Sequence, residues 1–350
     1  MGLKRWQRSA IALTACLLLA GCEAEEPSQP LTVVGWGGSS QRAHRDAYWT
    51  SFVVHTGIPL QEDTWHGGID VLREKARSGD WDIVQVEVEE LLLGCAEGLF
   101  EPMDWRALGG REAFIEPSVQ DCGVGAMVWS QLFGYDADRM PNGPRNWAEF
   151  WDVQRFPGRR GLRRTPKYTL EFALMADGVE PDDVYKVLRT EAGVDRAFRK
   201  LDEIKPHAVW WTSISQVPDL LTSGRVIASV TSPGRLLVAN RDEGRHFKVV
   251  WDGNIYAVDF WVIMKGSRRK SQALRLVQYM KQPEHEARLA HFIPTGLSNR
   301  QAIASLEPAL RVDTPSNAGN LAHAVELDAQ FWVEHSSELT ERFEAWLQKR

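Results

Sequence analysis

The side chains with the clearest chemical potential in this sequence are tryptophans that stand near carboxylates. The chain has 15 tryptophans, and those on predicted loops or strand ends are Trp36, Trp65, Trp210, Trp211, Trp251 and Trp261. The accompanying acids are Glu87, Glu89, Glu171 and Asp259. Aromatic faces attract organic cations through the ring quadrupole, and carboxylates hold ammonium groups by charge-assisted hydrogen bonds. The pattern therefore favours a binding site for a small organic cation.

Several of these residues fit structural roles equally well. Trp36 and Trp211 are as consistent with anchoring a hydrophobic core as with facing a ligand. Glu171 follows Lys167 by four residues in a predicted helix, where the two would form a solvated ion pair. The acids at positions 89 and 90 suit the first turn of a helix, where negative charge complements the dipole.

Asp259 has the stronger functional claim. It interrupts an otherwise apolar predicted strand, residues 255–264. A buried carboxylate needs a partner, because an unpaired charge in an apolar environment is strongly unfavourable. A ligand cation is one such partner.

Signatures of enzymes are missing from the sequence. It has no GxSxG elbow, phosphate-binding Walker loop, dinucleotide fingerprint or HExxH motif. His285 and His291 are six residues apart and would face different sides of a helix. The Gly-rich segment 35–39 lacks the lysine that a phosphate loop requires. These absences favour a binding protein with no catalytic residues, no metal site and no cofactor.

The elements that must position these residues alternate between strand and helix. Strands are predicted at 31–36, 58–65 and 81–86, with helices following at about 39–55 and 69–78. Ser39 or Ser40 is the expected N-cap of the first helix. Such alternation predicts an α/β fold with a parallel sheet, whose ligands meet the loops after the strands. Those loops are 36–39, 65–68 and 87–90.

The middle of the chain continues in the same style. Thr165 and Pro166 predict the start of a helix that runs to Met175, with Thr as cap and Pro at the first position. A basic loop, residues 159–164, precedes this helix and is expected to be a solvated surface. If Arg163 or Arg164 instead lies near a cleft, it would favour an acidic ligand. Further helix is expected at 145–151, and strands at 209–211, 226–230, 248–251 and 260–264.

The N-terminus has the layout of a secretory signal with a lipoprotein cleavage box. Basic residues precede an apolar run from Ala10 to Ala20, and Leu19-Ala20-Gly21 leads into Cys22. The run is about half the ~20 residues that a transmembrane anchor needs. We therefore expect residues 1–22 to form a signal with a lipidated Cys22, and the polar residues 23–30 to form a flexible tether.

The net charge limits the possible binding partners, and the cysteine count indicates a disulfide. The chain carries 41 basic and 47 acidic residues, a net charge of −6; loss of residues 1–21 would leave 38 basic residues and a net of −9. Nucleic acid is therefore an unfavourable partner. After processing, Cys95 and Cys122 remain, and in an oxidising compartment we expect them to form a disulfide rather than a metal site.

The order of motifs resembles a known family. The segments VVGWGGS, TGIPLQEDTWHGG, WDIVQVE, NWAEFWDVQRFPGRRGLRR, TPKYTLEFAL and IYAVDFWVI are similar to those of the spermidine/putrescine-binding branch of bacterial extracellular solute-binding proteins. The resemblance covers nearly all of residues 31–350 and includes the cysteine pair. It implies a two-lobed clamshell, each lobe a mainly parallel sheet flanked by helices. The implied division assigns 31–130 and 259–298 to lobe I, and 131–258 and 299–350 to lobe II.

The resemblance also implies a set of ligand-binding residues. By position these are Trp36, Glu87, Glu171, Trp211, Tyr256 and Asp259, with Asp259 as the carboxylate that grips an amine. We add Ser39 and Arg235 to this set as candidates of this chain itself. The segment 230–235 departs from the family pattern, because polyamine binders usually offer an aromatic residue and an amide there. Arg235 would repel a polyamine if it faced the cleft.

The function implied is that of a lipid-anchored substrate-binding component of an ABC importer. It would act as a monomer on the periplasmic or extracytoplasmic face, capture a small cationic solute such as a polyamine, and deliver it to an ABC permease. The lipid would be its only membrane contact. A ligand-sensing lipoprotein that signals to a membrane partner is the alternative, and an exported hydrolase or transferase is disfavoured by the missing motifs.

Overall fold

The structure, a computed structural model, describes residues 29–349. The expected signal, the lipidation site Cys22 and the tether up to residue 28 lie outside this range. Among the residues described, no helix is both long and apolar enough to cross a bilayer.

One mixed sheet extends through the whole described chain. Along its main path the strand order is β2-β1-β3-β9-β5-β8-β6-β7, with β10 beside β9 and β4 beside β5. The pairs β1/β2, β1/β3, β6/β7 and β6/β8 are parallel, whereas β9 and β5 run antiparallel to their neighbours on the main path. The strands are β1 (Leu31–Gly35), β2 (Leu60–Thr64), β3 (Ile83–Val86), β4 (Val119–Gln120), β5 (Gly123–Asp136), β6 (Arg160–Arg163), β7 (Ala208–Trp211), β8 (Ala228–Thr231), β9 (Phe247–Ile263) and β10 (Val325–Glu326).

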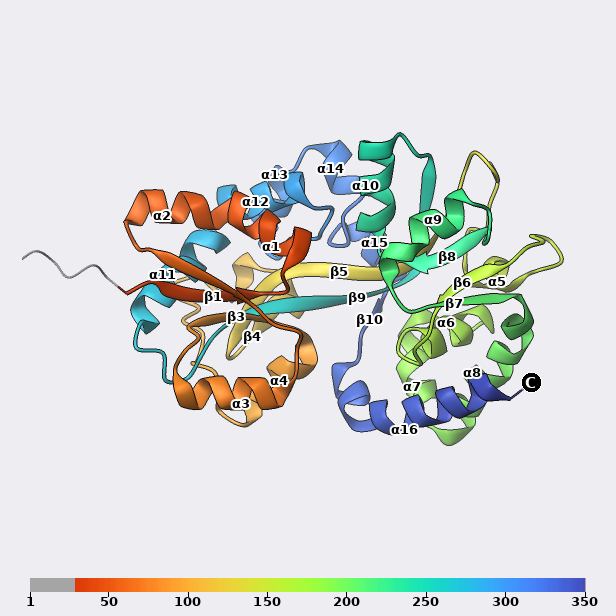
Figure 1. The fold of residues 1–350 in the computed structure, drawn as a ribbon, viewed down its shortest axis with the longest axis horizontal. Coiled ribbons are helices and arrows are strands. Elements are labelled where there is room, and N and C mark those ends of the chain that lie inside the picture. The colour runs from red at the N-terminus through yellow and green to blue at the C-terminus, as the bar shows by residue number, and fades with distance from the viewer. Residues whose placement is uncertain (1–28, 350) are drawn as a thin grey trace, which may run out of the picture.

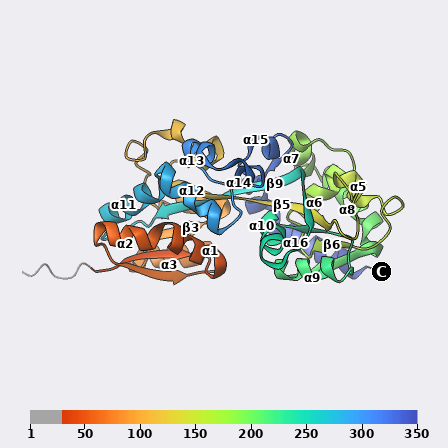
Figure 2. The same ribbon diagram turned by 90° about the horizontal axis from the view of Figure 1, so that it is seen from above.

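Two lobes are built on the two ends of this sheet (Figure 1). Strands β5 and β9, of 14 and 17 residues, run side by side from one lobe into the other. Their ladder has register shifts between Gly125 and Met127 and between Gln131 and Phe133. Seen from above, the helices gather in two groups joined through these strands (Figure 2). The predicted α/β clamshell is confirmed, and the antiparallel crossing strands are what make each lobe's sheet mixed.

Lobe I contains β1, β2 and β3 with helices on both faces. Two hydrophobic clusters fill it, one on each side of the sheet, and Val33 and Val34 of β1 point into different clusters because successive side chains of a strand alternate. Its helices are α1 (Gly38–His44), α2 (Thr50–Thr56), α3 (Ile69–Ser78), α4 (Val88–Ala96), α11 (Lys270–Lys281), α12 (Pro283–Phe292) and α13 (Arg300–Ser305), with a π-helical turn, Arg45–Trp49, between α1 and α2.

Lobe II contains β6, β7 and β8 around a third hydrophobic cluster. Helix α8 shows why it packs there: Val194, Ala197, Phe198, Leu201 and Ile204 are buried along one face at helical spacing. Burial of a large apolar side chain of this kind contributes about 1.5–3 kcal/mol. The helices are α5 (Trp147–Trp151), α6 (Thr169–Ala176), α7 (Val184–Leu188), α8 (Glu191–Ile204), α9 (Val217–Thr222), α10 (Pro233–Glu243) and α16 (Ala329–Gln348).

The chain returns to lobe II later than the predicted boundary at residue 299. Ala302 and Leu306, in and just after α13, pack in a lobe I cluster. Val325 is the first residue after them in the lobe II cluster. The short helices α14 (Pro308–Val312) and α15 (Ala318–Leu321) lie between these points.

Several local predictions can be compared directly. Helix α3 spans the predicted residues, and Gly57 ends α2 in a left-handed conformation with φ of 69°. The predicted serine N-cap is wrong: Gly37 occupies the cap without a side-chain hydrogen bond, and Ser39 lies inside the first turn. Helix α6 starts at Thr169 instead of Pro166, and Tyr168 instead of Thr165 is its N-cap.

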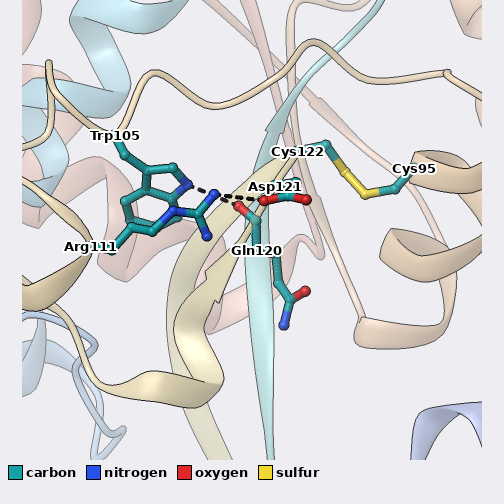
Figure 3. The surroundings of a disulfide bond; sticks show 6 residues. All are labelled: Cys95, Trp105, Arg111, Gln120, Asp121 and Cys122. Atoms are coloured by element: carbon teal, nitrogen blue, oxygen red, sulfur yellow. Dashed lines mark hydrogen bonds and ion pairs between the residues drawn. A yellow bond between two sulfur atoms is a disulfide. The ribbon is translucent and has the colours of Figure 1, made fainter.

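The expected disulfide is present between Cys95 and Cys122. The Cα atoms are 6.0 Å apart, a normal separation for such a bond. Figure 3 shows the bridge beside the start of β5, where the Trp105 indole donates to the Gln120 carbonyl at 3.1 Å. Arg111 pairs with Asp121 at 2.6 Å and lies over the Trp105 ring. The bridge therefore ties α4 to the start of a crossing strand.

Candidate functional site

A cavity of about 760 Å³ lies between the lobes. The first turn of α1 lines it from lobe I, and the first turn of α10 lines it from lobe II. Met127 and Trp129 of the crossing strand β5 form part of its wall. The residues that line it include Ser39, Ser40, Met127, Trp129, Ser232 and Arg235. We call this space, together with the strand ends beside it, the interlobe cleft.

A second hollow, of about 1020 Å³, lies on the outside of lobe I. Residues of α2, α11 and α12, such as Phe52 and Tyr279, line it. It touches one lobe only. A ligand there could not report on the relative position of the two lobes, so the interlobe cleft is the better candidate.

Asp259 of β9 is the central acid of the cleft. It lies directly opposite Met127 in the β5–β9 ladder, so both side chains are on the same face of the sheet. Asp259 is 4% exposed. The indoles of Trp36 and Trp129 and the amide of Gln85 donate hydrogen bonds to it at 2.9, 2.8 and 2.9 Å. Strands β1, β3, β5 and β9 thus converge on one carboxylate.

All three donors to Asp259 are uncharged. Among residues 29–349, no lysine, arginine or histidine forms an ion pair with it. Burial raises the pKa of Asp259 to about 8, and the negative charge of nearby Glu87 adds to the rise, while the three hydrogen bonds oppose it. A cation placed beside Asp259 would relieve this penalty.

Aromatic rings wall the same region. Trp36 stacks on Trp65 with ring centres 5.2 Å apart, and both follow lobe I strands. Trp129 meets Tyr168 of lobe II edge to face at 6.0 Å. The indole faces offer cation–π surfaces next to the carboxylate. The predicted combination of tryptophan and acid is therefore found at Asp259.

A second group of charges lies where α4 faces the start of α6. Glu87 follows β3 and begins α4, and burial raises its pKa to about 6, although the Lys167 charge opposes the rise. Lys167 of lobe II is hydrogen-bonded and ion-paired to Glu89 of lobe I. Burial alone would lower the pKa of Lys167, but Tyr168, Glu89 and Glu87 raise it overall. Lys167 is therefore a cation at neutral pH.

Tyr168 fixes the segment that carries Lys167. Its φ of 74° is the only positive value at a non-glycine position in residues 29–349. An L-residue in this region costs about 1–2 kcal/mol, so packing must hold it there. The buried ring of Tyr168 lies 5.5 Å from the Lys167 Nζ and 5.9 Å from the Arg163 guanidinium.

Arg235 supplies positive charge on the other side of the cleft. It is an exposed residue in the first turn of α10 and lines the cavity. Its side chain has no hydrogen-bond or ion-pair partner in the described part of the chain. Of the other basic candidates, Arg164 instead pairs with Glu344 of α16 at 2.5 Å.

The predicted site residues fall into two groups. Trp36, Glu87 and Asp259 come together, and Ser39 and Arg235 line the adjoining cavity. The other three, Glu171, Trp211 and Tyr256, lie outside the cavity and make other contacts. Their assignment to a ligand site stays a prediction.

Glu171 is buried inside lobe II, where it accepts hydrogen bonds from Tyr185 and Trp332, both at 2.8 Å. It does not pair with Lys167, contrary to the alternative drawn from their spacing. Trp211 is 3% exposed and belongs to the lobe II cluster. Tyr256 donates to Glu326 of β10 at 3.0 Å.

Sequence reasoning missed Trp129, Gln85 and Lys167 as site residues. Trp129 stands in β5, a strand that the pattern 123–136 did not reveal because glycines and polar residues interrupt it. Gln85 lies in the predicted strand 81–86, and nothing in the sequence indicates that its amide faces the site. Lys167 was assigned to the helix that starts later, so its approach to Glu89 across the cleft had no signal in the sequence.

Comparison with known proteins gives concordant results. Residues 66–309 match the family model described as bacterial extracellular solute-binding protein. The gamma-aminobutyric acid-binding protein of Pseudomonas aeruginosa is 38% identical over 340 residues, which are 97% of this chain and 96% of the relative.

Solved structures agree with this. An ABC transporter substrate-binding protein from Bradyrhizobium japonicum USDA 110 is 31% identical, with a TM-score of 0.81 over 91% of this chain and 99% of that one. The structure described as the Atu4243-GABA receptor is 28% identical, with a TM-score of 0.80 over 92% of this chain and 98% of that one.

Proposed function

The chain belongs to the bacterial extracellular solute-binding proteins, and we propose that it captures a small ω-amino acid such as gamma-aminobutyrate (GABA) and delivers it to an ABC permease. Members of this family bind solutes and are not enzymes. The protein is thus a substrate-binding component of an ABC transporter that works outside the cytoplasm.

The environment of Asp259 carries the ligand proposal. It is a buried carboxylate, held by three neutral donors between indole rings, and it has no cationic partner in residues 29–349. A ligand ammonium would provide the missing charge. The free guanidinium of Arg235 lines the adjoining cavity and suits the carboxylate of the same ligand.

Two observations favour a zwitterion over the polyamine that the sequence resemblance suggested. Arg235 lines the cavity together with Asp219, Arg241, Asp242 and Glu243. Asp242 and Glu243 are already paired with Arg241 and Arg245, so the unpaired Arg235 would repel a second ammonium placed beside it and attract a carboxylate. Both the P. aeruginosa relative and one similar structure are named for GABA. These names describe those proteins, and they support the same ligand class here.

The mechanism requires contacts to both lobes. Asp259 and Trp36 belong to the lobe I side of the cleft and Arg235 to the lobe II side. A ligand that bridges them binds the closed form more tightly than the open one and shifts the population toward closure. The permease would recognise the closed shape. We also propose that Cys22 carries a lipid that tethers the protein to its membrane, as the sequence of residues 19–22 indicates.

Calorimetric titration of the purified protein with GABA, butylamine, butyrate and putrescine tests the ligand. We expect GABA to bind tightest, because only it offers both charges to the two sides of the cleft. Arg235→Ala should weaken GABA binding while leaving butylamine binding unchanged, and Arg225→Ala, at an exposed arginine of lobe II outside the cavity, serves as a charge-matched control. Tightest binding of putrescine by the unaltered protein would contradict the proposal.

Uptake measurements separate transport from the sensing alternative. Cells that lack the gene should accumulate labelled GABA more slowly than cells that carry it. Normal uptake in the deletion strain, combined with GABA binding by the purified protein, would favour a sensor.

A further inference from the structure

The charges of the interlobe cleft contain one unusual member, a lysine from lobe II that reaches acids of lobe I. Lys167 lies between β6 and α6, whereas its partner Glu89 is in the first turn of α4. Their side chains are only 20% and 18% exposed. Val88, next to Glu89, also packs against the lobe II cluster. The cleft is thus closed at this edge, while the edge between α1 and α10 remains open as the cavity.

This lysine is held in place by its surroundings. Tyr168 keeps a left-handed backbone conformation directly after it, and the Tyr168 ring lies beside its ammonium group. The same ring contacts Trp129, whose indole donates to Asp259. A short chain of contacts therefore connects Lys167 to the central acid of the cleft.

Two cations of the cleft bear on a charged ligand, because Arg241 of the cavity is already paired with Asp242. Lys167 lies at the closed edge with Glu87 and Glu89, and Arg235 lies in the open cavity. An ω-amino acid can pair its single ammonium with Asp259 and its carboxylate with Arg235, and neither cation repels it. A ligand with two ammonium groups would direct its second ammonium toward one of these cations, and like charges brought close together repel.

We propose that Lys167 determines specificity: it acts as a built-in ammonium that occupies the Glu87–Glu89 acids of the cleft and thereby excludes ligands with a second ammonium. The inference rests on the proposed function in taking the interlobe cleft as the ligand site. On this view, the side chain of Lys167 alone decides whether the acid-rich cleft prefers diamines or ω-amino acids.

The test compares the affinities of GABA and putrescine in three variants by calorimetric titration. Loss of the ion pair between lobes weakens closure for both ligands alike, so the informative quantity is the ratio of the two affinities. In Lys167→Met the ratio should move toward putrescine by at least about ten-fold, because the repulsion is removed and Glu89 is released. Lys167→Arg keeps the charge and should keep the ratio.

Lys186→Met is the matched control, since Lys186 is an exposed lysine of lobe II paired with Asp183 on its own lobe. It should leave the ratio unchanged. The double variant Lys167→Met/Glu89→Gln should lose the gain, because the released acid is gone. Thermal unfolding checks that each variant is folded, and Lys167→Gln replaces the methionine variant if that one is not.

An unchanged ratio in folded Lys167→Met, or an equal change in Lys186→Met, overturns the inference while leaving the proposed function standing. Absence of GABA binding by the unaltered protein overturns the proposed function alone. In that case the inference is decided by putrescine: binding that emerges in Lys167→Met and not in Lys186→Met supports it, and no such binding overturns it.

Discussion

Trp36 and Asp259, which are 223 positions apart in the chain, are joined by a hydrogen bond of 2.9 Å from the indole Nε1 to Oδ2. Trp36 follows the first strand of the protein, and Asp259 lies in the long strand that returns from lobe II. The bond therefore depends on the completed sheet. It holds an aromatic ring and a carboxylate side by side in the cleft.

Asp259→Ala should weaken GABA binding by at least about thirty-fold. Removal of one member of a buried charge pair typically costs about 2–5 kcal/mol, or some thirty-fold to several thousand-fold in affinity. Asp259→Asn should have a similar effect on binding. The native fold should survive with a lower free energy of unfolding, because Trp36, Gln85 and Trp129 lose their buried acceptor. Titration calorimetry measures the loss, and Asp138→Asn, at an exposed aspartate, is the control; unchanged affinity would remove Asp259 from the site.

GABA affinity should rise with pH as Asp259 loses its proton. Its pKa is raised from 3.8 to about 8, mainly by burial, so the folded ligand-free protein holds a proton that the unfolded chain has already released. Stability of the ligand-free protein therefore contains a contribution that is full at low pH and is lost as pH rises toward 8. A ligand ammonium favours the charged carboxylate, so binding releases the proton.

This proton release can be measured directly. Below pH 8 the observed binding enthalpy should depend on the ionisation enthalpy of the buffer. Glu87, whose pKa is about 6, should add to the effect at the acidic end. The dependence should vanish in a variant with asparagine at position 259 if any binding remains, and a buffer-independent enthalpy in the unaltered protein would contradict the prediction.

Glu171→Gln should leave ligand affinity within about two-fold, because the side chain lies inside lobe II and keeps its acceptor oxygen for Tyr185 and Trp332. Glu171→Ala should lower the free energy of unfolding by about 1–3 kcal/mol, since both donors lose their acceptor. Denaturant unfolding and calorimetry separate the two effects. A large loss of affinity in the glutamine variant would return Glu171 to the ligand site.

Cys95→Ser should lower the midpoint of thermal unfolding. The bridge closes a loop with a sequence separation of 27, which corresponds to roughly 3–4 kcal/mol on the chain-entropy model. A reducing agent should lower the midpoint of the unaltered protein by a similar amount and should not affect the variant. Two titratable thiols in the native protein, or an unshifted midpoint, would argue against the bond.

The lobe I elements near the N-terminus were predictable because local signals agree there. Short apolar strands alternate with helices bounded by glycine, and the limits of α3 follow from its own sequence. The combination of Trp36 with Asp259 followed from residue chemistry and from the family resemblance. These inferences need only local periodicity and the rule that ligands meet the ends of parallel strands.

The crossing strands were not predictable in the same way. The sequence indicated two short strands, 248–251 and 260–264, where β9 is continuous from Phe247 to Ile263. Between them Asn254 accepts a hydrogen bond from Ser130, 124 positions away, so the strand continues through contacts that the local sequence does not reveal. Lys167 escaped for the same reason, since its partner lies 78 positions away.

The strand order has a consequence for how the chain folds outside the cytoplasm. In lobe I, β3 pairs with β9 and not with β5. A chain that emerges with its N-terminus first can form β1, β2 and β3 early, but the edge of β3 stays unpaired until residue 263 has been translocated. Three quarters of the polypeptide must therefore pass through the membrane before the first lobe can close its sheet. The exported chain is exposed to strand-pairing errors over that interval, which is when a holding chaperone would be of most use to it.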